Sequence, residues 1–326
     1  MWTVNGTDLH YVIVGTGEPI VVLHGGPGGN LLDMLELVKF APSHRWVFYD
    51  QRGSGESDRF PVDPKALDTA ATFFSIEQHV ADLEGVREKL GAEQITVLGH
   101  SWGGGLAAFY AAAHPDRVKR LIVYNGGPMW PDLKAAKKDA FKARATPEVG
   151  AQLAETGKRI GENMESWSQE MLDVEFAKMV LPILPLFDCV VGQPPNPGEI
   201  GRGGFWANQL TNSYIDKFDR PSFAAKLAKV NAPALLTYGR CEPNPPERQT
   251  FLRDALPNAT MVVFDQSGHN AHREQPELFG RVLNAFLTDA ALPVTPFDGS
   301  AQSLGWSPAL PQAPKAEGEG EPYGAE

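Results

Sequence analysis

Short apolar runs alternate with longer amphipathic stretches over the first part of the chain. The apolar runs are rich in β-branched or aromatic residues, which predicts strands at residues 9–14, 19–23, 45–49 and 118–124. Residues 75–90 carry apolar positions at helical spacing and predict an amphipathic helix. Strands that alternate with helices favour an α/β fold with a mostly parallel sheet covered on both faces.

This alternation stops between residues 128 and 227, where helical stretches and loops dense in Pro and Gly take over. The pattern predicts an inserted helical cap above the sheet. Aromatic residues recur in it, and they are expected to pack the cap or to contact a ligand: Trp130, Trp167, Phe187, Phe205, Trp206 and Tyr214. The earlier alternation then returns, with strands predicted at 233–238 and 260–264 and helices at 246–256 and 276–287.

The last part of the chain, residues 291–326, is rich in Pro and contains Gly-Glu repeats at 318–321. Such a composition buries little apolar surface and predicts a disordered tail. The predicted organisation is therefore an α/β core from residues 1–127 and 228–290, a helical cap from 128–227, and a tail from 291–326.

The motif Gly-His-Ser-Trp-Gly at residues 99–103 lies between a predicted strand at 94–98 and an Ala-rich predicted helix at 106–113. Gly-x-Ser-x-Gly in this context is typical of a nucleophile elbow. Gly99 and Gly103 would let the strand and the helix pass closely around a strained serine. Ser101 is therefore predicted to be a catalytic nucleophile.

A serine hydroxyl needs a base that takes its proton, and that base needs a third group to orient it. In an elbow-type sheet the acid and the histidine follow the serine in chain order. The predicted base is His269, in a loop between a strand and a helix, with His272 as the alternative.

The predicted acid is Glu242, which follows the strand at 233–238 and precedes a helix. Glu247 and Asp265 are the alternatives. A glutamate is longer than the more usual aspartate, so its turn has to lie further back.

A tetrahedral intermediate needs backbone N–H donors near its oxyanion. Trp102, directly after the nucleophile, is predicted to supply one of them. The Gly-rich loop at residues 24–29 is predicted to supply the other from Gly26, with Gly25 as the alternative. This loop does not predict a phosphate site, because no Gly-Lys-Ser/Thr follows it.

The net charge of −11 argues against nucleic acid or an anionic membrane as a partner. No signal peptide is visible and no apolar run approaches the roughly 18 residues of a membrane span, so a cytoplasmic location is expected. Cys189 and Cys241 are too few and too far apart to predict a disulfide framework, and neither has the neighbours of a metal site. The sequence predicts no metal or cofactor, a small-molecule substrate, and no particular oligomeric state.

Several of these segments together resemble the proline iminopeptidases of the α/β-hydrolase fold. The likeness rests on His24 to Gly28, Asp50 to Ser57, Gly99 to Gly104, Gly239 to Glu242, and Ser267 to His269. It covers about residues 1–127 and 228–290. The resemblance implies an α/β-hydrolase fold and a triad of Ser101, His269 and Glu242. The loop of residues 50–57 is expected to brace the rim of the site through Asp50 and Arg52.

The chain also departs from that family's pattern. His100 stands where the family usually has glutamine, and Glu242 stands where an aspartate is usual. The cap lacks a recognisable Trp-Glu helix of the kind that binds the substrate's free α-amine. Acidic cap residues are present, but nothing singles one out among Glu165, Glu170, Asp188 and Glu199.

The resulting hypothesis is a cofactor-independent serine hydrolase acting through an acyl-enzyme on a small amide or peptide, as an aminopeptidase or amino-acid amidase. An esterase or lactonase on the same triad is the alternative. A non-catalytic small-molecule binding protein is a further alternative, because fold alone does not imply catalysis. Dehalogenase or epoxide hydrolase chemistry is excluded, since it needs an aspartate nucleophile on this fold.

Overall fold

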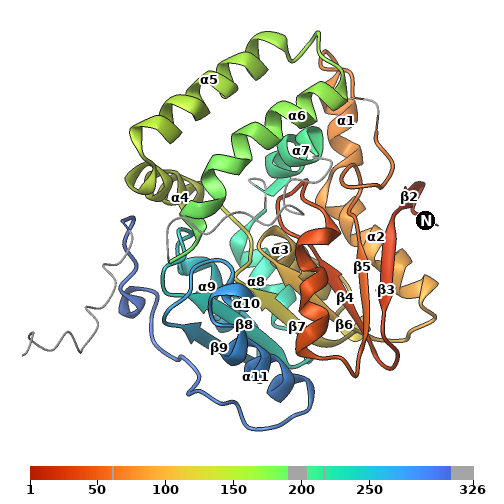
Figure 1. Ribbon diagram of the computed structural model, residues 1–326. Coiled ribbons are helices and arrows are strands. Elements are labelled where there is room, and N and C mark those ends of the chain that lie inside the picture. The colour runs from red at the N-terminus through yellow and green to blue at the C-terminus, as the bar shows by residue number, and fades with distance from the viewer. Residues whose placement is uncertain (61, 190–203, 216–217, 310–326) are drawn as a thin grey trace, which may run out of the picture.

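A seven-stranded sheet in the order β3-β5-β4-β6-β7-β8-β9 forms the centre of the molecule (Figure 1). The computed structural model describes residues 1–60, 62–189, 204–215 and 218–309. Only β3 runs antiparallel to its neighbour, and the other pairs are parallel, so the predicted α/β architecture is confirmed. The strands are β3 (Tyr11–Val14), β4 (Pro19–Leu23), β5 (Arg45–Tyr49), β6 (Ile95–His100), β7 (Val118–Tyr124), β8 (Ala234–Gly239) and β9 (Ala259–Phe264).

Successive residues of the central strands face opposite sides of the sheet, so each strand contributes to two hydrophobic cores. In β4, Val21 and Leu23 pack with helices α2, α3, α8 and α9, whereas Ile20 and Val22 pack with η1 and α11. This two-sided burial explains why the strands are apolar throughout. The helices are α2 (Ile76–Lys89), α3 (Trp102–Ala113), α8 (Arg220–Leu227), α9 (Glu247–Ala255), α11 (Pro276–Leu287) and the 3₁₀ segment η1 (Leu31–Phe40).

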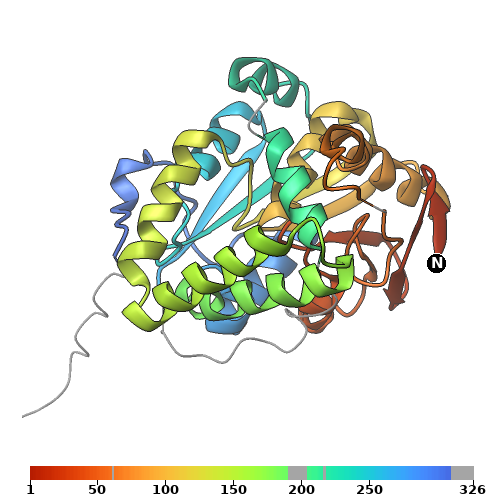
Figure 2. The ribbon, with the colours of Figure 1, turned by 90° about the horizontal axis from the view of Figure 1, so that it is seen from above.

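A group of helices lies above the carboxyl ends of the strands (Figures 1 and 2). It consists of α4 (Pro131–Arg144), α5 (Pro147–Asn163), α6 (Gln169–Val180), η3 (Leu181–Phe187) and α7 (Phe205–Ile215). Phe205 and Trp206 of α7 pack with Phe176 of α6 and with α1 (Leu67–Phe73) in a third hydrophobic cluster. We call this group the cap helices.

Short elements complete the chain. They are the β1 (Trp2–Val4) and β2 (Thr7–Leu9) ribbon, η2 (Pro115–Arg117), α10 (Ala271–Glu274) and η5 (Gln302–Leu304). The strand predicted at 9–14 is interrupted at His10, where β2 leaves the ribbon and β3 enters the main sheet. Within the described ranges no helix is long and apolar enough to cross a membrane.

The expectation of a disordered tail is wrong for residues 291–309. The Phe297 N–H donates to the carbonyl of Met261 at 2.7 Å, and the Trp306 indole donates to the carbonyl of Glu242 at 3.0 Å. Leu304 is buried in the main core. A few apolar residues spaced along this Pro-rich segment therefore hold it against the body, while residues 310–326 lie outside the described ranges.

Candidate active site

Ser101 occupies the turn between β6 and α3, in a left-handed conformation with φ 57° and ψ −119°. A residue with a side chain rarely adopts this conformation, so the turn is strained. The flanking glycines permit it: a Cβ at Gly99 would overlap the Gly103 carbonyl, and one at Gly103 would overlap the Leu23 carbonyl. The predicted strand, turn and helix around this motif therefore have the geometry of a nucleophile elbow.

His269 and Glu242 meet beneath the cap. The Nδ1 atom of His269 lies 2.6 Å from Oε2 of Glu242, and both side chains are buried. Burial alone would raise the pKa of the Glu242 carboxyl, but the interaction with His269 and the charge of Arg248 lower it to about 2. Arg248 Nη2 lies 3.6 Å from the same carboxylate oxygen. Glu242 is therefore ionised at neutral pH and oriented to hold His269.

The loop that carries His269 is fixed from several directions. Asn125 donates its amide to the carbonyls of Gly268 and His269, at 2.8 and 2.9 Å. The His269 N–H donates to the carbonyl of Phe187 in the cap helices at 2.9 Å. The Phe187 and His269 rings are 4.7 Å apart, so the end of η3 rests directly on this loop.

The alternative acid and base residues have other partners. His272 is fully buried, with Nδ1 2.5 Å from the Tyr124 hydroxyl and Nε2 3.1 Å from Glu36. Asp265 is exposed and accepts a hydrogen bond from Arg240 at 2.7 Å. Glu247 is exposed at the first turn of α9. Of the acid and base candidates from the sequence, His269 and Glu242 are therefore the pair that the structure brings into contact.

The predicted oxyanion loop packs against the serine. A Cβ placed on Gly25 would lie 3.1 Å from the Ser101 Cβ. Gly26 has φ 118°, which suits glycine, and lines the same cavity as Ser101. Trp102 begins α3 directly after the serine, and its indole donates to Oε1 of Gln51 at 2.7 Å.

The loop of residues 50–57 braces this rim, as predicted. Asp50 accepts the N–H of Leu31 at 2.7 Å and that of Glu56 at 2.9 Å. The guanidinium of Arg52 pairs with the buried carboxylate of Asp82, with an Nε to Oδ2 distance of 2.6 Å. These contacts hold the loop beneath the site.

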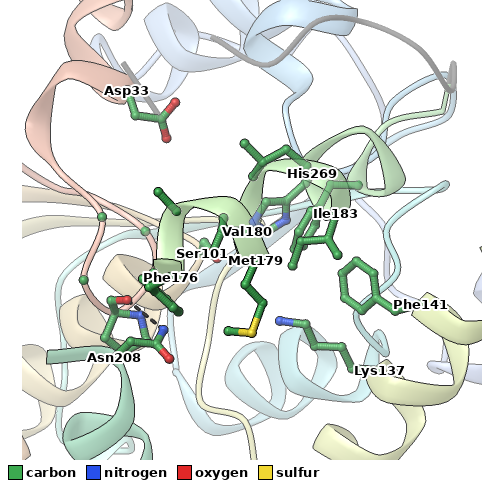
Figure 3. Close-up of a pocket in the computed structure, with 18 of the residues that line it drawn as sticks. Asp33, Ser101, Lys137, Phe141, Phe176, Met179, Val180, Ile183, Asn208 and His269 are labelled. Atoms are coloured by element: carbon green, nitrogen blue, oxygen red, sulfur yellow. Dashed lines mark hydrogen bonds between the residues drawn. The ribbon is translucent and has the colours of Figure 1, made fainter. Parts of the chain in front are cut away.

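A cavity of about 570 Å³ opens over Ser101 and His269 (Figure 3). Its floor is formed by Gly25, Gly26, Ser101 and His269 at the carboxyl ends of the strands. Its roof is formed by the cap helices and is mainly apolar: Phe141, Leu153, Phe176, Met179, Val180, Ile183, Leu184 and Phe187. Trp206, considered from the sequence as a possible ligand contact, is 3% exposed, packs against Phe205, and is not among these lining residues.

Charged groups also line the cavity, and sequence reasoning did not single them out. Lys134, Lys137 and Lys138 of α4 face one carboxylate, Asp33, among the described lining residues. Burial, together with the positive charge of Arg248, lowers the pKa of the Lys137 ammonium to about 8. A usable signal was the spacing of Lys137 and Phe141, which puts both on one face of a helix.

The acidic cap residues named above lie away from the lining. Glu165 and Glu170 are exposed, and Asp188 accepts a hydrogen bond from Asn270 at 3.1 Å. None of these three lines the cavity. Glu199 lies outside the described residues.

The two cysteines form a disulfide, which corrects the expectation drawn from their separation in the sequence. Cys189 and Cys241 are 52 residues apart in the chain, yet their Cα atoms are 5.1 Å apart. The bond ties the end of η3 to the residue next to Glu242. Disulfides are rare in the cytosol and common in oxidising compartments. The cytoplasmic location therefore stays a prediction, and this bond argues against it.

Residues 18–276 match a protein family described as the alpha/beta hydrolase fold. A proline iminopeptidase from Heyndrickxia coagulans is 28% identical over 281 residues, which cover 84% of this chain and 91% of that protein.

Solved structures agree in fold. An enol-lactonase from Burkholderia xenovorans LB400 has a TM-score of 0.59 and 22% identity, covering 87% of this chain and 98% of that one. A proline iminopeptidase from Mycobacterium smegmatis has the same TM-score and identity, covering 87% and 95%. At these identities the structural likeness establishes the fold and leaves the substrate open.

Proposed function

The chain belongs to the α/β-hydrolase family and is a hydrolase, and from that premise we propose that it is a serine hydrolase cleaving a small ester, lactone or amide through an acyl-enzyme. His269 takes the proton of Ser101 as the hydroxyl attacks the substrate carbonyl. Glu242 orients the imidazole and stabilises its protonated form. The backbone N–H groups of Gly26 and Trp102 hold the oxyanion, and water then releases the acyl group.

The observation that carries this proposal is the buried His269–Glu242 pair, at 2.6 Å, beside a serine held in a strained turn. A serine at an ordinary turn has no need of left-handed backbone geometry or of an oriented imidazole in the same cavity. No metal or cofactor is needed for this chemistry.

The size and cover of the cavity support a small substrate. About 570 Å³ accommodates a molecule of drug-like size beneath the cap helices. A folded protein would not reach Ser101 through this cover, so general endoprotease activity is not proposed.

The charges around the cavity favour an ester, a lactone or an amide without a free amine. A protonated amine needs a carboxylate partner, and the one described carboxylate in the lining, Asp33, already accepts a hydrogen bond from Arg273 at 2.7 Å. Lys134, Lys137 and Lys138 would repel a cationic substrate.

Aminopeptidase activity is the second candidate. It is supported by the proline iminopeptidase relative at 28% identity over most of both chains. It also has the support of the motifs shared with that family, including the Gly-rich loop and the serine followed by tryptophan.

The test compares 4-nitrophenyl butyrate with prolyl and alanyl 4-nitroanilides, free and N-acetylated, in the wild type and in Ser101→Ala. Ester turnover that is lost in the variant, together with labelling of Ser101 by a fluorophosphonate, is the expected result. Turnover confined to free-amine anilides would favour the aminopeptidase instead. Absence of both turnover and labelling would overturn the proposal and favour a non-catalytic binding protein.

A further inference from the structure

The roof of the cavity is mainly apolar, and its described lining also includes three lysines of α4, Lys134, Lys137 and Lys138. The Lys137 side chain extends from α4 into the cavity beside Phe141 and Met179 (Figure 3). Its Nζ lies 5.5 Å from the ring centroids of both Phe141 and Phe187. The half-buried Lys137 side chain therefore brings its ammonium toward aromatic surfaces.

Lys137 differs in this respect from the other lysines of α4, of which Lys138 also lines the cavity but is exposed to solvent. Lys134 donates to the carbonyl of Asn212 at 3.1 Å, and Lys142 lies on the surface beside Asp139 at 3.4 Å. Among the described residues, Lys137 lies over two aromatic rings and forms no ion pair with a carboxylate. The nearby acid, Glu242, is committed to His269 and Arg248.

An ammonium that is partly removed from water and has no carboxylate partner among the described residues is costly, and an anion that enters the cavity relieves that cost. The attraction between the two charges is also stronger here than in water, because the apolar roof lowers the local dielectric. Asp33, held by Arg273, lies on the opposite side of the cavity from Lys137 in Figure 3. An anionic ligand is therefore attracted to the Lys137 side.

We propose that Lys137 binds a carboxylate of the substrate, so that the preferred substrate is an ester, lactone or amide carrying one negative charge away from the scissile carbonyl. This inference deepens the proposed function and rests on it. A single ammonium among aromatic rings suits one carboxylate. A phosphate dianion is better matched by a guanidinium fork, and the described lining contains no arginine.

The test measures kcat/KM at pH 7 for matched charged and neutral esters. Mono-(4-nitrophenyl) glutarate is paired with 4-nitrophenyl valerate, and 4-(butanoyloxy)benzoate is paired with 4-acetylphenyl butanoate. The first pair carries the charge on the acyl side and the second carries it on the leaving group. Each rate is divided by the rate of hydroxide hydrolysis, so that intrinsic reactivity cancels.

The wild type is expected to favour the charged member of at least one pair. Lys137→Met should lower that charged-to-neutral ratio about 10- to 100-fold, as truncation of one partner of a desolvated charge pair does. Lys137→Arg should restore part of the ratio. Lys142→Met, on the exposed face of the same helix, should leave the ratio and both rates unchanged. An equal loss for charged and neutral esters in Lys137→Met, or no preference in the wild type, would overturn the proposal.

Failure of the proposed serine hydrolase function would give a different result. In that case the turnover of charged and neutral esters alike would not depend on Ser101. Carboxylate binding is measured separately, by the shift in melting temperature that glutarate or benzoate produces in Ser101→Ala. A shift that is lost when Lys137→Met is added supports the site without any turnover. A shift of equal size in both proteins rejects it.

Discussion

The floor and the roof of the cavity are built in opposite ways. The floor is a set of polar groups that orient one another: Glu242 holds His269, and Asn125 holds the loop from behind. The roof is mainly hydrocarbon and aromatic surface, and its described charged residues are lysines of α4, among which Lys137 lies over two aromatic rings. Under the proposed function, the carboxyl ends of the strands determine the reaction, whereas the cap helices determine the choice of substrate.

The strongest way to test the floor is to remove the nucleophile. Ser101→Ala should lower kcat by about 10⁵-fold, since the residues of a triad act as a unit. Binding to the roof should persist, because no roof contact involves the hydroxyl. Circular dichroism checks that the fold is retained, and a loss of less than tenfold would remove Ser101 from the mechanism.

Removing the charge of the acid, Glu242, should lower kcat almost as much. Glu242→Gln should lower kcat by about 10³-fold or more, because the amide does not stabilise a protonated imidazole. Glu247→Gln, an exposed neighbour on the same segment, is the matched control and should behave as the wild type. If the two variants lost activity equally, the assignment of Glu242 would fail.

The disulfide between Cys189 and Cys241 joins the end of η3 in the roof to the loop of Glu242 in the floor, and it should contribute to stability. Replacing both Cys189 and Cys241 by serine should lower the free energy of unfolding by about 2–4 kcal/mol. Urea titration measures this, and a reducing agent should destabilise the wild type but leave the double variant unchanged. Equal stability of the oxidised and reduced wild type would contradict the prediction.

The smallest expected effect is on the pH dependence of stability. An acid of the floor, Glu242, and an acid of the cap helices, Asp173, should contribute to it in opposite senses. Burial raises the pKa of Asp173 to about 6, while that of Glu242 is lowered to about 2. Glu242 therefore stabilises the fold above its unfolded-state pKa, and this contribution is lost as the pH falls toward 2. Asp173 acts in the opposite sense, because its stabilising contribution is present in acid and is lost as the pH rises through about 6.

Asp173→Asn should therefore raise the melting temperature at pH 8 by a few degrees relative to the wild type, and by less at pH 5. The asparagine oxygen still accepts the Phe205 N–H, which Asp173 accepts at 2.8 Å. An equal change at both pH values would mean that the charge of Asp173 has no part in it.

The sequence predicted best those elements whose conformation is determined by residues close together in the chain. The apolar runs around Ser101 predicted β6 and α3 to within a few residues, because a buried parallel strand and an Ala-rich helix each have a distinct local pattern. The loops that carry His269 and Glu242 could be predicted because chain order on a parallel sheet puts them at one edge.

The parts that escaped prediction depend on contacts between distant segments. The disulfide of Cys189 and Cys241 and the docking of Trp306 onto the Glu242 carbonyl follow from the folded arrangement and have no local signal. For Lys137, the helical spacing puts its side chain on one face with Phe141, but the sequence does not reveal that this face lines a cavity. Trp206 was a possible ligand contact from the sequence, but residues that are its neighbours only in the folded chain bury it.

The disulfide also changes what a cut in the chain would do. It closes residues 189–241 into a covalent ring. Ser101 lies in the chain before this ring, and His269 lies in the chain after it. A protease that cleaves once inside the ring yields two polypeptides that still form a single molecule, with nucleophile, acid and base held together. The nicked protein would run as one band on a gel until it is reduced, and only then would its two halves separate.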